Sequence, residues 1–435
     1  MVGPTGTDSI YVLLDNGDGI LLMRTDMDGN PVWTHLYGDF RDKASTLGEA
    51  ADGNIIMVSW TISNIDAVAT KIDAITGAVI WSYRYPGLNE ASTITKRGAR
   101  HVLMGDTAYF TPANGSLAKP MAIAINDADG SVVWAKKYFE GQADYLDSYK
   151  HYITGYAVNP NKIIYVGKYY DAVVDPHGQD HRRVSVLPIN AWTGNPIINA
   201  MHTYDLELGA NDYAIESDAP FPWDIARVKD PVSGNFEGFA IAGSYSHSDT
   251  YTFTATDPVV LRVDQTYNPL WAKLYDSPNS AYGFARGIRQ NVYFFGGRLN
   301  VYTSWENYQN AIDGSSTISD LLRINEADGL PHGITIYDVP NDDFAGMSIN
   351  EDGSGGYLAI GTRDTTPFDT FQLLKVGQIG GNVDCLVEHE IEAEDLMVDD
   401  IIVEIVPEDV EVNLAVYDLP FVDLPLNVFE CEGSI

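Results

Sequence analysis

The side chains best suited to bind a ligand are aromatic rings and imidazoles in four long polar connections, at 106–120, 168–183, 244–258 and 300–320. Flat rings beside short polar side chains are typical of surfaces that bind sugars or other proteins. We therefore predict a binding ridge; the alternative is that these connections pack against one another. The candidate ridge residues are Tyr109, Tyr169, Tyr170, His177, His181, Tyr251, Trp305 and Tyr308.

Metal chemistry has two candidate patterns in the sequence. His177 and His181 lie beside Asp175 and Asp180, and imidazoles and carboxylates are common metal ligands. Hydrated loop side chains explain this cluster more simply, so we predict no metal site there. The Asp-x-Asp-Gly turns resemble calcium loops, but none continues to a glutamate at the twelfth position. Calcium is the only cofactor that the sequence leaves open.

Motifs for catalysis are absent from the sequence. It contains no HExxH, GxSxG or GxxxxGK[ST], which would supply a zinc site, a nucleophile or a phosphate-binding loop. No nucleophile, base and metal set converges either. We predict no catalytic residue, no cofactor-binding residue and no enzymatic activity.

The elements that position these side chains come from one recurring hairpin: a strand, a tight turn with glycine, and a second strand that often carries tryptophan. The clearest copies are residues 21–39, 68–87 and 122–141, and weaker copies are 184–205, 259–277, 321–339 and 371–382. Glycine suits the left-handed position of such turns. The residues of this motif are Trp33, Trp81, Trp134, Trp271, Gly29, Gly77 and Gly130.

A second apolar strand precedes each hairpin, as in 54–60, 162–168 and 239–245, and a less apolar stretch precedes most of these. Four strands per unit and seven units predict an all-β fold, a seven-bladed β-propeller over about residues 8–382 within a domain of 1–384. The predicted blades lie near 9–39, 40–87, 88–142, 143–206, 207–278, 279–340 and 341–384.

The repeat resembles the tryptophan-containing blades of quinoprotein-like propellers and of secreted bacterial repeat propellers. Residues 71–81, KIDAITGAVIW, are similar to the tryptophan-docking motif of pyrroloquinoline-quinone dehydrogenases, whereas 25–38, TDMDGNPVWTHLYG, look more like the secreted, non-enzymatic kind. The quinone enzymes carry a vicinal cysteine pair, and this chain has no cysteine before Cys385. The resemblance therefore implies the fold, in its non-enzymatic form.

Charge restricts the partners. The chain of 435 residues has a formal net charge of −35, which disfavours nucleic acid. No apolar run is long enough to predict a transmembrane helix. The first residues lack the basic and apolar regions of a signal peptide, yet the repeat begins at Ile10 without room for an inner first strand. We expect a removed leader, a strand supplied from elsewhere, or a three-stranded first blade.

The chain changes character at residues 385–435, which contain fifteen Asp or Glu and no Lys or Arg. Alternating apolar residues predict strands here, although so short a segment cannot form a core of its own. The predicted assembly tail contains Val410, Val412, Leu414 and Val416. Cys385 and Cys431 bracket the segment, which favours a disulfide in an oxidising compartment over two free thiols.

These observations predict a secreted or cell-surface structural protein. Its terminal β-segment would pair with a strand edge, of its own propeller or of a neighbouring copy, and build a filament or surface layer. Self-association into a homopolymer is the expected partnership, with a glycan or cell surface as another. The alternative is a monomeric extracellular module that binds glycan or protein through the ridge.

Overall fold

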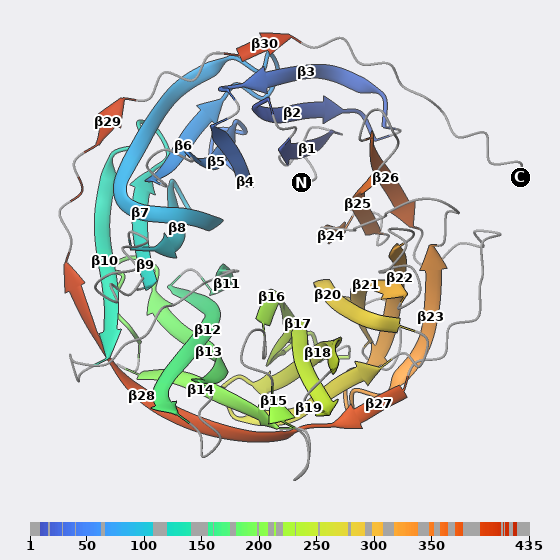
Figure 1. Ribbon diagram of the computed structural model, residues 1–435. Helices are drawn as coiled ribbons and strands as arrows, with labels where there is room; N and C mark the ends of the chain where they lie inside the picture. Colours follow the sequence, from blue (N-terminus) through green and yellow to red (C-terminus); the bar gives the residue numbers. More distant parts are fainter. Residues whose placement is uncertain are drawn as a thin grey trace, which may run out of the picture.

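The computed structural model is all-β, and its described part contains no helix (Figure 1). The described residues are 9–15, 18–27, 29–39, 41–61, 66–107, 120–140, 155–159, 161–174, 180–197, 200–207, 213–214, 221–230, 232–250, 253–276, 280–291, 298–307, 317–337, 348–351, 357–363, 370–376, 392–409, 412, 414–416 and 421–423. Since none of these residues is helical, none forms a helix long and apolar enough to cross a membrane.

Antiparallel pairing between consecutive strands divides the first half of the ring into blades, which we number in chain order. Blade 1 contains β1 (Ile10–Asp15), β2 (Ile20–Thr25) and β3 (Pro31–Tyr37). Blade 2 contains β4 (Asp42–Glu49), β5 (Ile55–Thr61), β6 (Asp66–Ile72) and the first part of β7 (Val79–Arg97). Blade 3 contains the second part of β7, β8 (Arg100–Asp106), β9 (Pro120–Asn126) and β10 (Val132–Glu140).

The second half of the ring follows the same order. Blade 4 contains β11 (Gly155–Asn159), β12 (Lys162–Val174), β13 (Asp180–Asn190) and β14 (Ala200–Glu207). Blade 5 contains β16 (Phe221–Lys229), β17 (Phe236–Thr250), β18 (Phe253–Asp264) and β19 (Pro269–Asp276), with the short β15 (Tyr213–Ala214) beside β17. Blade 6 contains β20 (Ser280–Asn291), β21 (Arg298–Asn307), β22 (Thr317–Asn325) and β23 (Pro331–Tyr337). Blade 7 contains β24 (Ser348–Glu351), β25 (Tyr357–Arg363) and β26 (Thr370–Val376).

These runs surround a central axis, with the last strand of each run on the perimeter (Figure 1). The predicted all-β propeller with a β-stranded acidic extension is therefore confirmed. The count of seven blades stays a prediction, because residues 1–8 and 377–391, which flank the junction of blades 7 and 1, lie outside the described residues.

The apolar core lies between neighbouring blades rather than within them. One cluster joins Ile56 and Val58 of blade 2 to Leu103 and Ile123 of blade 3. Four further clusters join blades 1 and 2, 3 and 4, 4 and 5, and 5 and 6. Because each sheet buries both faces against its neighbours, its strands are apolar along most of their length, as β5 and β9 are.

The extended hairpins of blades 4 and 5 correct one expectation. The polar connection 168–183 was predicted as a loop, but β12 and β13 pair as far as Val174 and Asp180. Likewise, β17 and β18 pair as far as Thr250 and Phe253. The β-branched and aromatic residues of these segments continue the ladders of their blades, so much of the predicted loop length is strand.

Candidate functional site

The C-terminal segment forms a belt of strands around the outside of the ring (Figure 1). It contains β27 (Glu392–Asp395), β28 (Met397–Asp409), β29 (Ala415–Val416) and β30 (Phe421–Asp423). We call these four strands the belt. They pair antiparallel with the outermost strands of blades 5, 4, 3, 2 and 1 in turn. The belt thus passes the blades in the reverse of their order in the sequence.

Strand β28 passes from one blade to the next without interruption. Glu404 is the register partner of Ala200 in β14, and the following residue, Ile405, is the partner of Glu140 in β10. This continuity is possible because the outermost strands follow the perimeter of the ring (Figure 1). Backbone pairing along the belt covers edges that would otherwise be open to other strands.

Side chains add to this backbone pairing at the start of the belt and between β28 and β29. The Nζ atom of Lys273 lies 2.6 Å from Oδ1 of Asp395, and the Lys273 side chain is only 8% exposed. The next residue, Leu396, is buried in the cluster between blades 4 and 5, and its N–H donates to the Ala272 carbonyl oxygen at 3.1 Å. Val412 and Leu414 pack against the cluster between blades 2 and 3.

The four residues of the predicted assembly tail are distributed along this path. Val412 and Leu414 contact the propeller's own core, and Val416 is the register partner of Tyr83 in β7. Val410 lies outside the described residues. The belt thus meets the blade edges of its own chain in this single copy.

The four motif tryptophans occupy the same place in their blades. Each is the third residue of its strand, which is β3, β7, β10 or β19. Each also comes directly after a shift in the register with the neighbouring strand. The tryptophans are Trp33, Trp81, Trp134 and Trp271. Their rings lie near the turn of the next blade, as Trp81 lies near Gly130 and Trp271 near Gly329.

A tyrosine four residues after each tryptophan ties the blade to its neighbour. The Tyr37 hydroxyl donates to the Gly77 carbonyl oxygen at 2.6 Å, and the Tyr85 hydroxyl to that of Gly130 at 2.8 Å. Tyr138 and Tyr275 make the equivalent bonds to the turns of blades 4 and 6. Burial raises the pKa of the Tyr85 hydroxyl, which keeps it protonated as a donor.

The junction of blades 4 and 5 uses a different pair of side chains. Ala200 replaces tryptophan at the start of β14, and Tyr267 replaces the turn glycine, with a positive φ of 72°. The Tyr267 ring is buried, lies 5.2 Å from His202, and stacks on Phe239. The Tyr204 hydroxyl still donates to the turn, at the Tyr267 carbonyl oxygen. At this junction the large aromatic ring is therefore supplied by the turn, through Tyr267, and not by the outermost strand.

Gly130→Ala should lower the free energy of unfolding by about 2–4 kcal/mol, measured by denaturant titration. Gly130 has a φ of 71°, and an added Cβ would lie 2.7 Å from Tyr83 and 3.1 Å from Trp81. Gly29→Ala is the matched control, since Gly29 also has a positive φ but nothing lies within 4 Å of an added Cβ. Equal losses in the two variants would contradict docking of the turn on the neighbouring ring.

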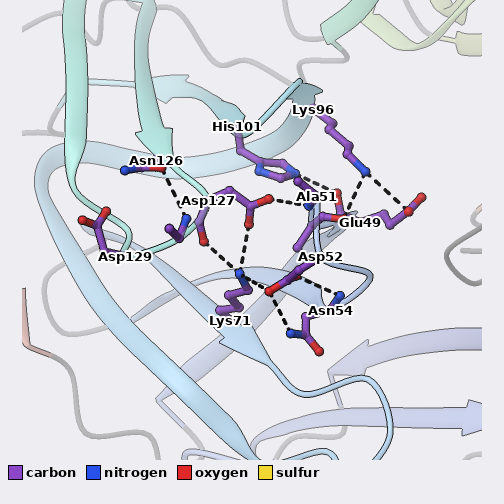
Figure 2. Close-up of polar contacts among 12 residues, drawn as sticks. Glu49, Ala51, Asp52, Asn54, Lys71, Lys96, His101, Asn126, Asp127 and Asp129 are labelled. Atoms are coloured by element: carbon purple, nitrogen blue, oxygen red, sulfur yellow. Dashed lines mark hydrogen bonds and ion pairs between the residues drawn. The ribbon is translucent and has the colours of Figure 1, made fainter.

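A buried lysine connects blades 2 and 3 (Figure 2). The Nζ atom of Lys71 lies 2.9 Å from Oδ2 of Asp52 and 3.3 Å from Oδ1 of Asp127, and it donates to the Asp127 carbonyl oxygen at 3.0 Å. The Lys71 and Asp127 side chains are each 4% exposed. The Ala51 N–H donates to the other Asp127 carboxylate oxygen. Hydrogen bonds from Lys71 and Asn54 outweigh partial burial and lower the pKa of Asp52.

His101 lies beside this lysine, and Figure 2 shows its Nε2 directed at the Glu49 carbonyl oxygen, 2.9 Å away. A carbonyl oxygen only accepts, so Nε2 carries the proton of the neutral ring. Its Nδ1 has no hydrogen-bond partner among the described residues. Burial lowers the pKa of His101, and the Asp127 carboxylate only partly offsets this effect.

The protein should lose stability as the pH falls below about 6.5, the ordinary histidine pKa. Because the folded-state pKa of His101 is lowered, protons bind the unfolded chain more readily and favour unfolding. The loss is at most about 1.4 kcal/mol per pH unit from this group. Denaturant titrations from pH 8 to 5 should show a shallower pH dependence in His101→Gln. Identical slopes in the two proteins would contradict a neutral buried histidine.

A second buried charge cluster connects blades 5 and 6 at the corresponding position. Arg262, opposite Trp271 in the ladder as Lys71 is opposite Trp81, lies 3.4 Å from Glu326. Gln290 donates to Glu326 at 2.7 Å. Burial raises the pKa of Glu326, although its bonds to Gln290 and Arg262 act against this. Each cluster therefore connects two neighbouring blades through a buried ion pair.

Most ridge residues lie where side chains or backbone are not described. Tyr169 and Tyr170 are in β12, His181 in β13 and Trp305 in β21, in strands rather than in the predicted loops. Tyr109, His177, Tyr251 and Tyr308 lie outside the described residues, as do Cys385 and Cys431. The ridge and the disulfide therefore stay predictions. Within the described part of the chain, no group of three or more His, Cys, Asp or Glu could hold a metal ion.

Sequence reasoning missed two features of these contacts. The tyrosine after each tryptophan was visible in WTHLY, WSYRY, WAKKY and WAKLY, but its hydroxyl partner was not. The belt's partners were missed because an edge strand is recognised by backbone groups that every sequence shares.

Comparison with known proteins finds similarity over part of the chain. No family model matches. Two quinoprotein ethanol dehydrogenases match over 118 residues: that of Pseudomonas putida is 28% identical, and that of Pseudomonas aeruginosa 26%. Each match covers 26% of this chain and 17% of the length of the relative, and both relatives are enzymes by name.

Solved structures give low similarity scores. A Synechocystis apocarotenoid oxygenase mutant, Glu150Gln, has a TM-score of 0.38 at 12% identity and covers 77% of this chain and 72% of its own. The WD40 domain of SCAP from fission yeast has a TM-score of 0.34 at 9% identity, covering 93% and 95%. The sequence matches support membership among β-propeller proteins and do not distinguish one kind of propeller from another.

Proposed function

We propose that this chain is a non-enzymatic structural subunit of a secreted or cell-surface assembly, a filament or layer in which the belt of one copy pairs with the blade edges of the next. The observation that carries the proposal is the belt itself. It pairs with the outermost strands of five blades, and its described apolar side chains Leu396, Val412 and Leu414 pack against clusters of the propeller.

Strand exchange requires only that the same contacts form between copies. The belt's pairings are antiparallel ladders, and an identical neighbour offers the same edges in the same register. Residues 377–391 separate β26 from β27 in the sequence, and fifteen residues reach at most about 50 Å. A belt that reaches the next subunit instead of its own would build an open, head-to-tail chain of subunits.

The second candidate is a monomeric binding module with the belt closed on its own propeller. The extended β12–β13 hairpin favours it, because Tyr169 and Tyr170 are the register partners of Arg183 and Arg182. Arg183 is buried and lies 3.4 Å from Asp205, which leaves the pair of Tyr170 and Arg182. An aromatic ring across the ladder from a guanidinium would suit an acidic glycan or an acidic protein surface.

The full-length protein should assemble with rising concentration, and a chain ending at Asp384 should be monomeric. Light scattering after size exclusion, with negative-stain images of the same fractions, checks both. Circular dichroism should show that the truncated chain retains its β-structure. Assembly by the truncated chain, or a full-length protein that stays monomeric at high concentration, would favour the binding module.

A further inference from the structure

The belt advances by the same number of residues at every blade. One position in each outermost strand marks this advance: the residue two positions after the motif tryptophan, or after Ala200 in blade 4. The belt residues paired with these positions are Asp395, Ile402, Asp409, Val416 and Asp423. The opposing residues of blades 5 to 1 are Lys273, His202, Lys136, Tyr83 and His35. Successive belt positions are therefore seven residues apart, without exception over five blades.

The sequence of the segment carries the same period. Leu396, Val403, Val410, Tyr417 and Leu424 each follow one of these positions, and Val398, Ile405, Val412, Leu419 and Leu426 lie two residues further on. Of these residues, Leu396 is buried between blades 4 and 5, and Val412 packs against the cluster between blades 2 and 3. A strand rises by about 3.3 Å per residue, so one unit spans about 23 Å along the perimeter.

Charge distinguishes the units from one another. In blades 5, 3 and 1 an aspartate of the belt stands opposite Lys273, Lys136 or His35. In blades 4 and 2 the belt has Ile402 and Val416 at that position. Opposite charges directly across a ladder stabilise it, and like charges destabilise it. A shift by one unit in either direction would place an apolar side chain opposite Lys136 and opposite one of the two other bases.

We infer that residues 395–430 are a repeat of seven-residue strand units in which each unit pairs with one blade. Asp395, Asp409 and Asp423 determine the register of this pairing. This inference holds whether the belt pairs within one copy or between copies, and so does not rest on the proposed function. The apolar pattern continues through Leu424 and Leu426 to an acid at Glu430, which completes a further unit in the sequence.

Charge reversal in the full-length protein tests this inference, with amide hydrogen exchange as the measurement. Asp409→Lys, which faces Lys136, should speed exchange in β28 and β10 roughly tenfold. The double variant Lys136→Asp with Asp409→Lys should restore slow exchange. Glu404→Lys is the matched control, because Glu404 faces Ala200 and should change exchange little. Equal effects of the two single variants, or no rescue in the double variant, would overturn the role of the acids.

Deletions test the period separately from the charges. Removing the whole unit 410–416, which contains none of the three aspartates, should leave slow exchange in the remaining belt, moved by one blade. Removing Ile405 alone should lose the slow exchange of β28 beyond that point, because a one-residue shift turns every following side chain to the opposite face. If both deletions have the same effect, the seven-residue repeat is wrong. Size exclusion of the same variants reports on assembly independently.

Discussion

Lys71→Met should lower the free energy of unfolding by about 3–5 kcal/mol, measured by denaturant titration. The substitution keeps an apolar stem of similar length and removes the one ammonium group that pairs Asp127 (Figure 2). The Asp127 carboxylate is buried, and its Oδ1 has no hydrogen bond in the described structure. The Ala51 N–H would still donate to the other oxygen, but the negative charge would be left without an ion pair. The cost arises from that stranded charge more than from the lost contact.

Two further variants separate this explanation from a general effect of losing a lysine. In Lys71→Met with Asp127→Asn, the stranded charge is gone and much of the stability should return. Lys43→Met is the matched control, since Lys43 pairs with Asp15 at 3.0 Å in a partly exposed position and should cost less than about 1 kcal/mol. If Lys71→Met costs no more than Lys43→Met, the cluster does not attach blade 2 to blade 3 as described.

A disulfide between Cys385 and Cys431 should contribute about 4 kcal/mol of stability, because it would close a loop of 46 residues. The belt supplies a reason for the pairing that its sequence position alone did not. One seven-residue unit for each of seven predicted blades makes a circuit of about 49 residues. Cys385 and Cys431 are 46 positions apart, which is close to this length. Their bond would therefore join the two ends of the segment after it has passed once around the ring.

Intact mass after alkylation, with and without reduction, measures this directly. We expect no alkylation of unreduced, denatured protein and two alkylated thiols after reduction. The variant with both cysteines replaced by serine should unfold at a lower denaturant concentration. Two alkylated thiols in protein that was purified oxidised and never reduced would exclude the bond.

The fold followed from the sequence because its signals are local. The turn glycines and the strand alternation around them fixed the hairpins, and Trp33, Trp81, Trp134 and Trp271 marked equivalent strands. The contacts between blades were harder to foresee. The Tyr85 hydroxyl donates to the backbone carbonyl oxygen of Gly130, 45 residues away. Every residue has such a carbonyl, so the sequence does not indicate which one is the acceptor.

The hairpins and the belt show where sequence reasoning stopped. Polar composition suggested loops around Tyr169 and Tyr170, but a ladder needs only backbone partners, and β13 supplied them. The strands of the belt were expected, yet strand patterning does not name the edge that a strand joins. The fourteen-residue spacing of Asp395, Asp409 and Asp423, two units of seven, was present in the sequence. It became meaningful only beside Lys273, Lys136 and His35.

Cysteine cross-linking between differently labelled subunits tests the proposed strand exchange most directly. In a background with both native cysteines replaced by serine, one subunit carries Lys273→Cys and the other Asp395→Cys. These positions are register partners, at a separation that suits a disulfide. After mixing under assembling conditions and oxidation, exchange predicts a covalent dimer on non-reducing gels. Only monomers from the mixture, alongside efficient internal cross-linking in the double-cysteine chain, would contradict it.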